Sequence, residues 1–261
     1  MERPARSVEG VGLHVLRFPG DGSSPAVVVV HGGMDRASSF GRVARRLADV
    51  PLVTYDRRGY GRSIDAGTTD LDGHVDDLLA VVGTEPAVVF GHSVGGVVAL
   101  VAAERRPELV RAVLAFEAPA PWAHWWPQPS RRPADDAESD PGDEAERFMR
   151  RMVGDAIWER LPPGTRADRR AEGPALRADL RSIDRSSPPY DAASIAVPVL
   201  SAAGGETTWW HRRAAEELAA AVPDGRFEVL GDATHGAHLT HAAETAHLVR
   251  AARALGVTPA P

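Results

Sequence analysis

The sequence predicts an α/β fold: a doubly wound, mostly parallel sheet with helices on both faces and one helical insertion. Short apolar runs alternate with longer segments that repeat their apolar residues at helical spacing. Runs such as VVVV at 27–30 and AVVF at 87–90 are apolar at every position, as expected for parallel strands that are buried on both faces. Strand and helix patterns follow one another through short connections, which is typical of open α/β sheets.

The expected strands are short apolar runs in the first and last parts of the chain. In chain order they are Leu13–Phe18, Ala26–Val30, Pro51–Tyr55, Ala87–Phe90, Val110–Phe116, Val199–Ala203 and Arg226–Leu230. Helical patterns fill the intervals between them. The expected helices are Ser38–Ala48, Leu71–Val82, Val94–Arg105, Trp209–Ala221 and Ala242–Ala254.

The alternation of strand and helix patterns stops at 119–195, where proline, aspartate, arginine and tryptophan accumulate. ERFMRRMVGDAIWERL at 146–161 carries its apolar residues close to a helical stripe, so we expect a helical insertion. The acidic stretch DDAESDPGDEAE at 135–146 is expected to be a solvated loop, with an acid-rich ligand site as the alternative. The expected organisation is a core of residues 1–118 and 196–261, interrupted by a helical cap at 119–195.

Composition excludes several classes of function. The chain has 261 residues, which suits one large domain, and its formal charge of −6 argues against a nucleic-acid partner. It has no cysteine, so disulfides, thiolate metal sites and cysteine nucleophiles are excluded. The first residues, MERPARSVEG, lack the apolar core of a signal peptide, and no apolar stretch approaches a membrane span. We therefore expect a cytoplasmic protein with no membrane association.

A serine stands at the junction of an expected strand and an expected helix. The stretch GHSVGG at 91–96 fits the pattern G-x-S-x-G around Ser93, in which a sharp turn lifts the serine hydroxyl above the sheet edge. The alternative is a serine that merely caps the helix. A serine hydroxyl becomes a nucleophile only when the fold supplies a base, an acid that orients the base, and donors for an oxyanion.

Five motifs together resemble the α/β-hydrolase superfamily over nearly the whole chain. They are VVVVHGGM (27–34), YDRRGYGRS (55–63), GHSVGG (91–96), VPVL (197–200) and GDATHGAHL (231–239). The resemblance implies an α/β-hydrolase-like fold in which Ser93 is the nucleophile. It also implies an oxyanion hole made by the backbone N–H groups of Gly33 and Val94, with Met34 as a neighbouring candidate and His31 bracing the loop.

By the same resemblance, the base is a histidine after the last strand, which points to His235. His238 and His241 follow at spacings of three, so a metal-binding trio is the alternative, and His238 is otherwise expected to line the pocket. The position that usually carries the acid holds Thr207, within GGETTWW. One branch of the superfamily places the acid after the preceding strand, where this chain has Glu117.

Glu117 is the favoured acid on physical grounds as well. It ends the apolar run AVLAF, and a carboxylate at such a position is costly unless it is paired. Glu206 is the alternative acid. A catalytic set of Ser93, Glu117 and His235 keeps the family's order of nucleophile, acid and base.

All six tryptophans lie in or near segments that would roof this site. They either pack the cap onto the core or line a pocket for a bulky, flat or apolar substrate. The candidate pocket residues are Met34, Trp122, Trp126, Trp158, Trp210 and His238.

The expected function is hydrolysis of a small-molecule carboxylic ester, lactone or thioester through an acyl-enzyme. No metal, nucleotide or flavin is implied, and no nucleic acid or membrane is expected as a partner. Alternatives at the same site are C–C bond cleavage, acyl transfer and perhydrolysis, because one scaffold hosts many chemistries. An alternative of another class is a receptor-like protein that binds a ligand with little turnover.

Overall fold

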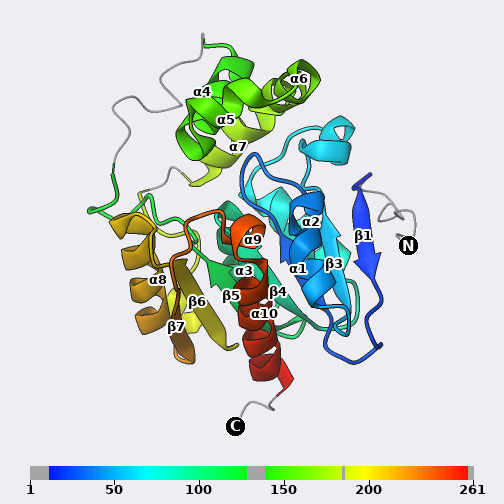
Figure 1. Ribbon diagram of the computed structural model, residues 1–261. Coiled ribbons are helices and arrows are strands. Elements are labelled where there is room, and N and C mark those ends of the chain that lie inside the picture. The colour runs from blue at the N-terminus through cyan, green and yellow to red at the C-terminus, as the bar shows by residue number, and fades with distance from the viewer. Residues whose placement is uncertain (1–11, 128–138, 184–185, 258–261) are drawn as a thin grey trace.

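The computed structural model describes residues 12–127, 139–183 and 186–257. Its centre is a seven-stranded sheet in the order β1-β3-β2-β4-β5-β6-β7 (Figure 1). Strand β1 is antiparallel to β3, and the other neighbours are parallel. The strands are β1 Val15–Phe18, β2 Val27–Val30, β3 Leu52–Tyr55, β4 Ala87–His92, β5 Val110–Phe116, β6 Val199–Gly204 and β7 Gly225–Leu230. The α/β fold expected from the sequence is confirmed.

Helices cover both faces of this sheet. Val28 and Val30 pack into one apolar cluster with α2 (Leu71–Val82) and α3 (Val94–Arg105). Val27 and Val29 pack into a second cluster on the opposite face, with α1 (Gly41–Arg46) and α10 (Ala242–Val257). Side chains alternate between the two faces of a strand, so a strand buried on both sides has to be apolar at every position.

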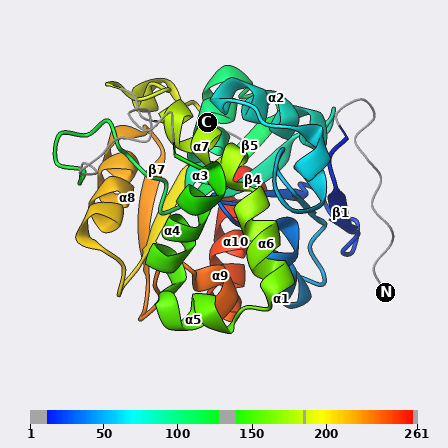
Figure 2. The same ribbon diagram turned by 90° about the horizontal axis from the view of Figure 1, so that it is seen from above.

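The four α-helices between β5 and β6 lie above the carboxyl ends of the parallel strands (Figure 1). They are α4 Pro141–Val153, α5 Asp155–Arg160, α6 Pro163–Ala171 and α7 Gly173–Ile183. We call α4 to α7 the cap helices; Figure 2 looks down on them, with the sheet beneath. Their apolar residues form a separate cluster that includes Trp158 and also takes in Met34 and Tyr60 of the core. The division of the chain into 1–118, 119–195 and 196–261 remains an interpretation.

Two details of the cap helices differ from the expectation. The pattern at 146–161 is divided between α4 and α5 at Gly154, whose φ of 83° is one that glycine adopts without strain. The acidic stretch at 135–146 is not a loop throughout. The Asp140 side chain caps α4, with Pro141 in the first turn, while residues 135–138 lie outside the described part.

The remaining helices are close to the sequence expectation. Helix α8 spans Trp209–Ala221, and the helix expected at 38–48 consists of the short 3₁₀ turn η1 (Ala37–Phe40) followed by α1. The glycine-rich stretch after β7 contains a short helix, α9 (Ala237–Thr240), that the sequence did not indicate. Within residues 12–127, 139–183 and 186–257, no helix has the length and apolar character needed to cross a membrane.

Candidate active site

Ser93 occupies a sharp turn between β4 and α3. Its φ of 53° and ψ of −128° are unusual for a residue other than glycine. The flanking glycines permit the close packing around it. A Cβ at Gly91 would lie 2.4 Å from the carbonyl oxygen of Gly95, and a Cβ at Gly95 would lie 2.2 Å from that of Val30. The turn therefore has the geometry of the nucleophile position that the motif predicts.

Glu117 follows β5 and is fully buried beside His235. Its Oε2 lies 2.6 Å from His235 Nδ1. Oε1 accepts a hydrogen bond from the Gly204 N–H at 2.9 Å, and Oε2 accepts one from Thr207 Oγ1 at 2.9 Å. Burial alone would raise the pKa of Glu117, but the hydrogen bonds from His235 and from the Gly204 N–H bring that pKa below its ordinary value.

These contacts define which nitrogen of His235 is available as a base. Ionised Glu117 only accepts hydrogen bonds, so Nδ1 of His235 carries the proton and Nε2 keeps a free electron pair. Glu206 is exposed, and its backbone N–H is bonded to the carbonyl oxygen of Ala233 at 3.0 Å. The structure therefore brings Glu117, and not Glu206, to the imidazole.

The backbone of His235 is held from β4. His92 Nε2 donates a hydrogen bond to the His235 carbonyl oxygen at 2.8 Å. Burial, together with the neighbouring His238 and His235, keeps the pKa of His92 well below its ordinary value, so this ring is neutral. His211 of α8 stacks on the His235 ring at 4.8 Å, and burial lowers its pKa to about 4, so it too is neutral.

The three histidines that follow β7 do not converge on one point. His235 contacts Glu117, His238 Nε2 lies 3.1 Å from Asp35 Oδ2, and His241 Nε2 lies 3.0 Å from an oxygen of Asp232. Each imidazole therefore faces a different carboxylate, and the alternative of a metal-binding trio has no support in this geometry.

Among the residues that the structure describes, two other groups have donor atoms close enough to hold a cation. Glu117, His211 and His235 form one group, but Glu117 is already bonded to Thr207, Gly204 and His235. Asp35, His92 and His238 form the other, with donor atoms within 4.8 Å of one another. His92 of this group is likewise bonded through Nε2 to the His235 carbonyl oxygen.

The loop after β2 lies against the serine. A Cβ at Gly32 would lie 3.0 Å from Cβ of Ser93, so the loop closely approaches the serine turn. The Arg57 N–H donates to His31 Nε2 at 2.8 Å, and His31 Nδ1 in turn donates to the Gly32 carbonyl oxygen at 2.7 Å. Burial and the nearby Arg57 lower the pKa of His31 to about 4, so His31 is a neutral brace of this loop.

Val94 is the second backbone group that the sequence singled out. It is the first residue of α3, so its N–H has no partner within the helix and points out of the helix's positive end. This is the arrangement that favours a developing negative charge next to Ser93.

The candidate pocket residues divide into separate groups. Trp126 packs edge-on against His211 at 5.2 Å, and Trp210 lies 6.1 Å from the same ring, so both approach His235 through His211. Trp158 and Met34 are buried in the cluster of the cap helices. Trp122 packs against Tyr190, and His238 stacks on Phe40 at 4.5 Å.

Sequence reasoning missed several residues that the fold brings to this region. Asp35 and His211 stand in no motif that indicates their position. Arg57 belongs to the DRRG stretch, but that stretch does not indicate its contact with the loop after β2. Asp179 of α7 contacts Arg57 across 122 residues of sequence, which no local pattern encodes.

The chain is similar to known proteins. Residues 27–248 match the model of the alpha/beta hydrolase family. An uncharacterised hydrolase, YraK, from Bacillus subtilis is 39% identical over 42% of this chain and 42% of its own length. The lipase LipV from Mycobacterium tuberculosis is 34% identical over 41% of this chain and 42% of its own length. The matched part of the chain thus spans about two-fifths of the length of these curated relatives.

A solved structure covers almost the entire chain. The enol-lactonase from Burkholderia xenovorans superposes with a TM-score of 0.74 and 22% identity, over 95% of this chain and 98% of that one. At this level of identity the likeness shows the fold. Together with the family match over residues 27–248, it establishes that the chain belongs to the alpha/beta hydrolase family.

Proposed function

We propose that this chain is a serine hydrolase that cleaves a small-molecule carboxylic ester, or a related lactone or thioester, through an acyl-enzyme. The observation that carries the proposal is the 2.6 Å contact between Glu117 and His235, at the same edge of the sheet as the strained Ser93. The partial match to a relative named as a lipase supports a carboxylic ester as the substrate class.

The mechanism uses groups of the protein and water. Nε2 of His235 takes the Ser93 proton as Oγ attacks the carbonyl carbon, and the carbonyl oxygen becomes an oxyanion bound by the N–H groups of Gly33 and Val94. Glu117 keeps the imidazole oriented and stabilises its positive charge. The imidazolium then gives its proton to the departing alcohol. In the second half, water loses a proton to His235 and attacks the acyl-enzyme, releasing the acid and restoring the Ser93 hydroxyl.

The substrate pocket is proposed to border the aromatic group around His211. Trp126 and Trp210 pack on His211, which itself stacks on the imidazole of His235. Aromatic faces next to the reacting group favour a flat or apolar acyl or alcohol group.

Serine-directed labelling tests this function. A fluorophosphonate should modify the wild-type protein at Ser93, as located by mass spectrometry, and should leave Ser93→Ala unlabelled. Hydrolysis of p-nitrophenyl esters of graded acyl length should fall by about a million-fold in Ser93→Ala. Near-normal hydrolysis by that variant would remove Ser93 from the mechanism. A wild-type protein that binds esters without labelling or turnover would support the receptor-like alternative.

A further inference from the structure

The Gly32 carbonyl group is held by two donors. It accepts hydrogen bonds from His31 Nδ1 at 2.7 Å and from Arg57 Nη2 at 3.2 Å. A trans peptide unit is planar, so its C=O and N–H groups point in opposite directions. Whatever fixes the Gly32 carbonyl therefore also fixes the direction of the Gly33 N–H, which is one of the two proposed oxyanion donors.

Arg57 is fully buried and belongs to the core, after β3. Besides Gly32, its side chain reaches the His31 carbonyl oxygen through Nε at 2.9 Å. The guanidinium is a rigid planar fork, so its orientation determines where all of its N–H groups point. Its other edge is bound by Asp179, with Nη1 and Nη2 at 2.9 and 2.7 Å from the two carboxylate oxygens.

Asp179 comes from helix α7, one of the cap helices, and is 2% exposed. Tyr60 donates a hydrogen bond to its Oδ2 at 2.6 Å, and His74 Nε2 lies 3.1 Å from its Oδ1. Asp179 also lies close to the loop itself, because a Cβ at Gly33 would be 3.9 Å from Asp179 Oδ2 and 3.5 Å from Leu176 of the same helix.

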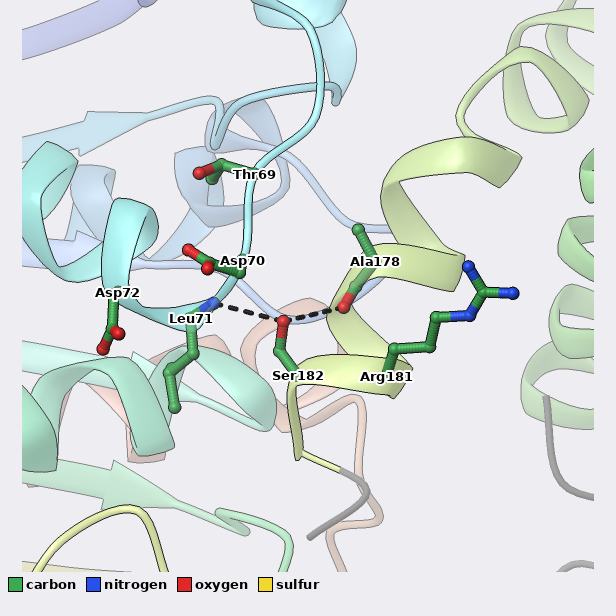
Figure 3. A pocket seen from close by; sticks show the side chains of 7 residues that line it. All are labelled: Thr69, Asp70, Leu71, Asp72, Ala178, Arg181 and Ser182. Carbon is green, nitrogen blue, oxygen red and sulfur yellow. Dashed lines mark hydrogen bonds between the residues drawn. The ribbon is translucent and has the colours of Figure 1, made fainter. Parts of the chain in front are cut away.

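A separate contact seats α7 on the core. Ser182 Oγ accepts a hydrogen bond from the Leu71 N–H at 3.1 Å and donates one to the Ala178 carbonyl oxygen at 2.8 Å, beside a surface pocket between α2 and α7 (Figure 3). Helix α6 adds a contact with the loop, since Arg169 Nη1 donates to the Met34 carbonyl oxygen at 2.9 Å. The cap helices thus touch the loop directly and through Arg57.

We propose that Asp179 is a positioning residue for the oxyanion hole: by binding Arg57 it aims the Gly33 N–H, so that the hole is complete only when α7 is seated on the core. This inference rests on the proposed serine hydrolase function. It assigns to the cap helices a part in transition-state stabilisation that is separate from any contact with substrate.

The test compares Asp179→Asn with the wild-type protein on p-nitrophenyl butyrate and on its thionoester analogue. Asparagine keeps the size of the side chain but removes its charge and its bidentate binding of Arg57. Loss of a whole oxyanion donor costs ~10²–10³-fold in kcat, so a misaimed donor should cost ~10–100-fold, with little change in KM. The preference for the oxygen ester over the thionoester should shrink, because sulfur accepts hydrogen bonds poorly and gains little from the hole.

Asp77→Asn is the matched control. Asp77 is 3% exposed and binds Arg58, the next residue after Arg57, through Nε at 3.0 Å and Nη2 at 2.5 Å. This variant removes a similarly buried partner of an arginine, but within the described part of the chain the Arg58 side chain binds Asp77 and the Ala66 carbonyl oxygen and not Gly32. It should lower thermal stability about as much as Asp179→Asn and leave the oxygen-to-thionoester ratio unchanged.

Tyr60→Phe keeps the inference open to refutation if Asp179→Asn fails to fold. It removes one partner of Asp179 and retains the ring that Arg57 packs on at 4.9 Å, so the ratio should shift in the same direction by a smaller factor. The positioning role is overturned if the wild-type protein hydrolyses esters and the folded variants keep its ratio of oxygen-ester to thionoester hydrolysis. The proposed function would then still stand. A wild-type protein that neither hydrolyses esters nor labels at Ser93 refutes the function, and this inference with it.

Discussion

Thr207 donates a hydrogen bond to Glu117, with Thr207 Oγ1 2.9 Å from Glu117 Oε2. Thr207 occupies the position at which the resemblance described above leads one to expect the acid, and here its hydroxyl donates to the carboxylate that contacts His235. The hydroxyl satisfies one acceptor site of the buried carboxylate and limits its rotation. The relationship explains why a glutamate can end the apolar strand β5 in a fully buried position.

The first prediction concerns the acid itself. Glu117→Gln keeps the size of the side chain, but its amide N–H can donate a hydrogen bond to Nδ1 where the carboxylate only accepts one, so the imidazole adopts the wrong tautomer. Ester hydrolysis should fall by up to ~10⁴-fold in kcat. Glu206→Gln is the control and should retain nearly full activity, because Glu206 is exposed. Equal losses in the two variants would count against Glu117.

The second prediction is that an aspartate at position 207 can take over the role proposed for Glu117. In the double variant Glu117→Gln with Thr207→Asp, the new carboxylate lies close to the position now occupied by Glu117 Oε2, which is 2.6 Å from His235 Nδ1. The double variant should recover at least ~10-fold of the kcat lost by Glu117→Gln alone. Thr207→Asp by itself should lower activity, because it places two carboxylates side by side. No recovery in a folded double variant would refute the proposed equivalence of the two positions.

The third prediction separates two neighbouring histidines. His235→Ala removes the proposed base and should reduce ester hydrolysis by about a million-fold. His238→Ala leaves Asp35 without the imidazole that lies 3.1 Å from its Oδ2 in a mostly buried place, so it should lower the free energy of unfolding by about 1–3 kcal/mol. Steady-state kinetics and urea denaturation measure the two effects. A larger loss of kcat in His238→Ala than in His235→Ala would indicate that His238, and not His235, is the base.

The fourth prediction is a dependence of stability on pH through His211. Its pKa is lowered to about 4 in the folded protein, mainly by burial, against an ordinary value of 6.5. Above pH 6.5 the ring is neutral in both states. As the pH falls from 6.5 to 4 the unfolded chain binds a proton that the folded protein does not, so stability is lost across that window, by about 3 kcal/mol at most.

His211→Phe removes this titration while keeping an aromatic ring on His235. Its free energy of unfolding should therefore fall less between pH 6.5 and 4 than that of the wild-type protein, as measured by urea denaturation at each pH. His247→Asn changes an exposed histidine and should follow the wild-type curve. Parallel curves for wild type and His211→Phe would contradict the prediction.

The sequence indicated every strand of the sheet and the positions of Ser93, Glu117 and His235, because these depend on local patterns. Strands buried on both faces are apolar throughout, and a glycine-flanked serine between a strand and a helix can be recognised from the neighbouring residues alone. Contacts such as Arg57–Asp179 and His211–His235 were not predictable, because they join segments that meet only when the helices pack. The break at Gly154 was missed because the apolar stripe continues across it.

The hydrogen bond from His92 to the His235 carbonyl oxygen has a consequence for protein engineering. Position 92 is the variable residue of the G-x-S-x-G pattern and would be an obvious target for a saturation library aimed at new substrates. Here that side chain anchors the main chain of the histidine that pairs with Glu117, while Glu117 holds its ring. A library at position 92 would therefore mostly return variants with a displaced imidazole, and the better targets for altered selectivity are Trp126 and Trp210.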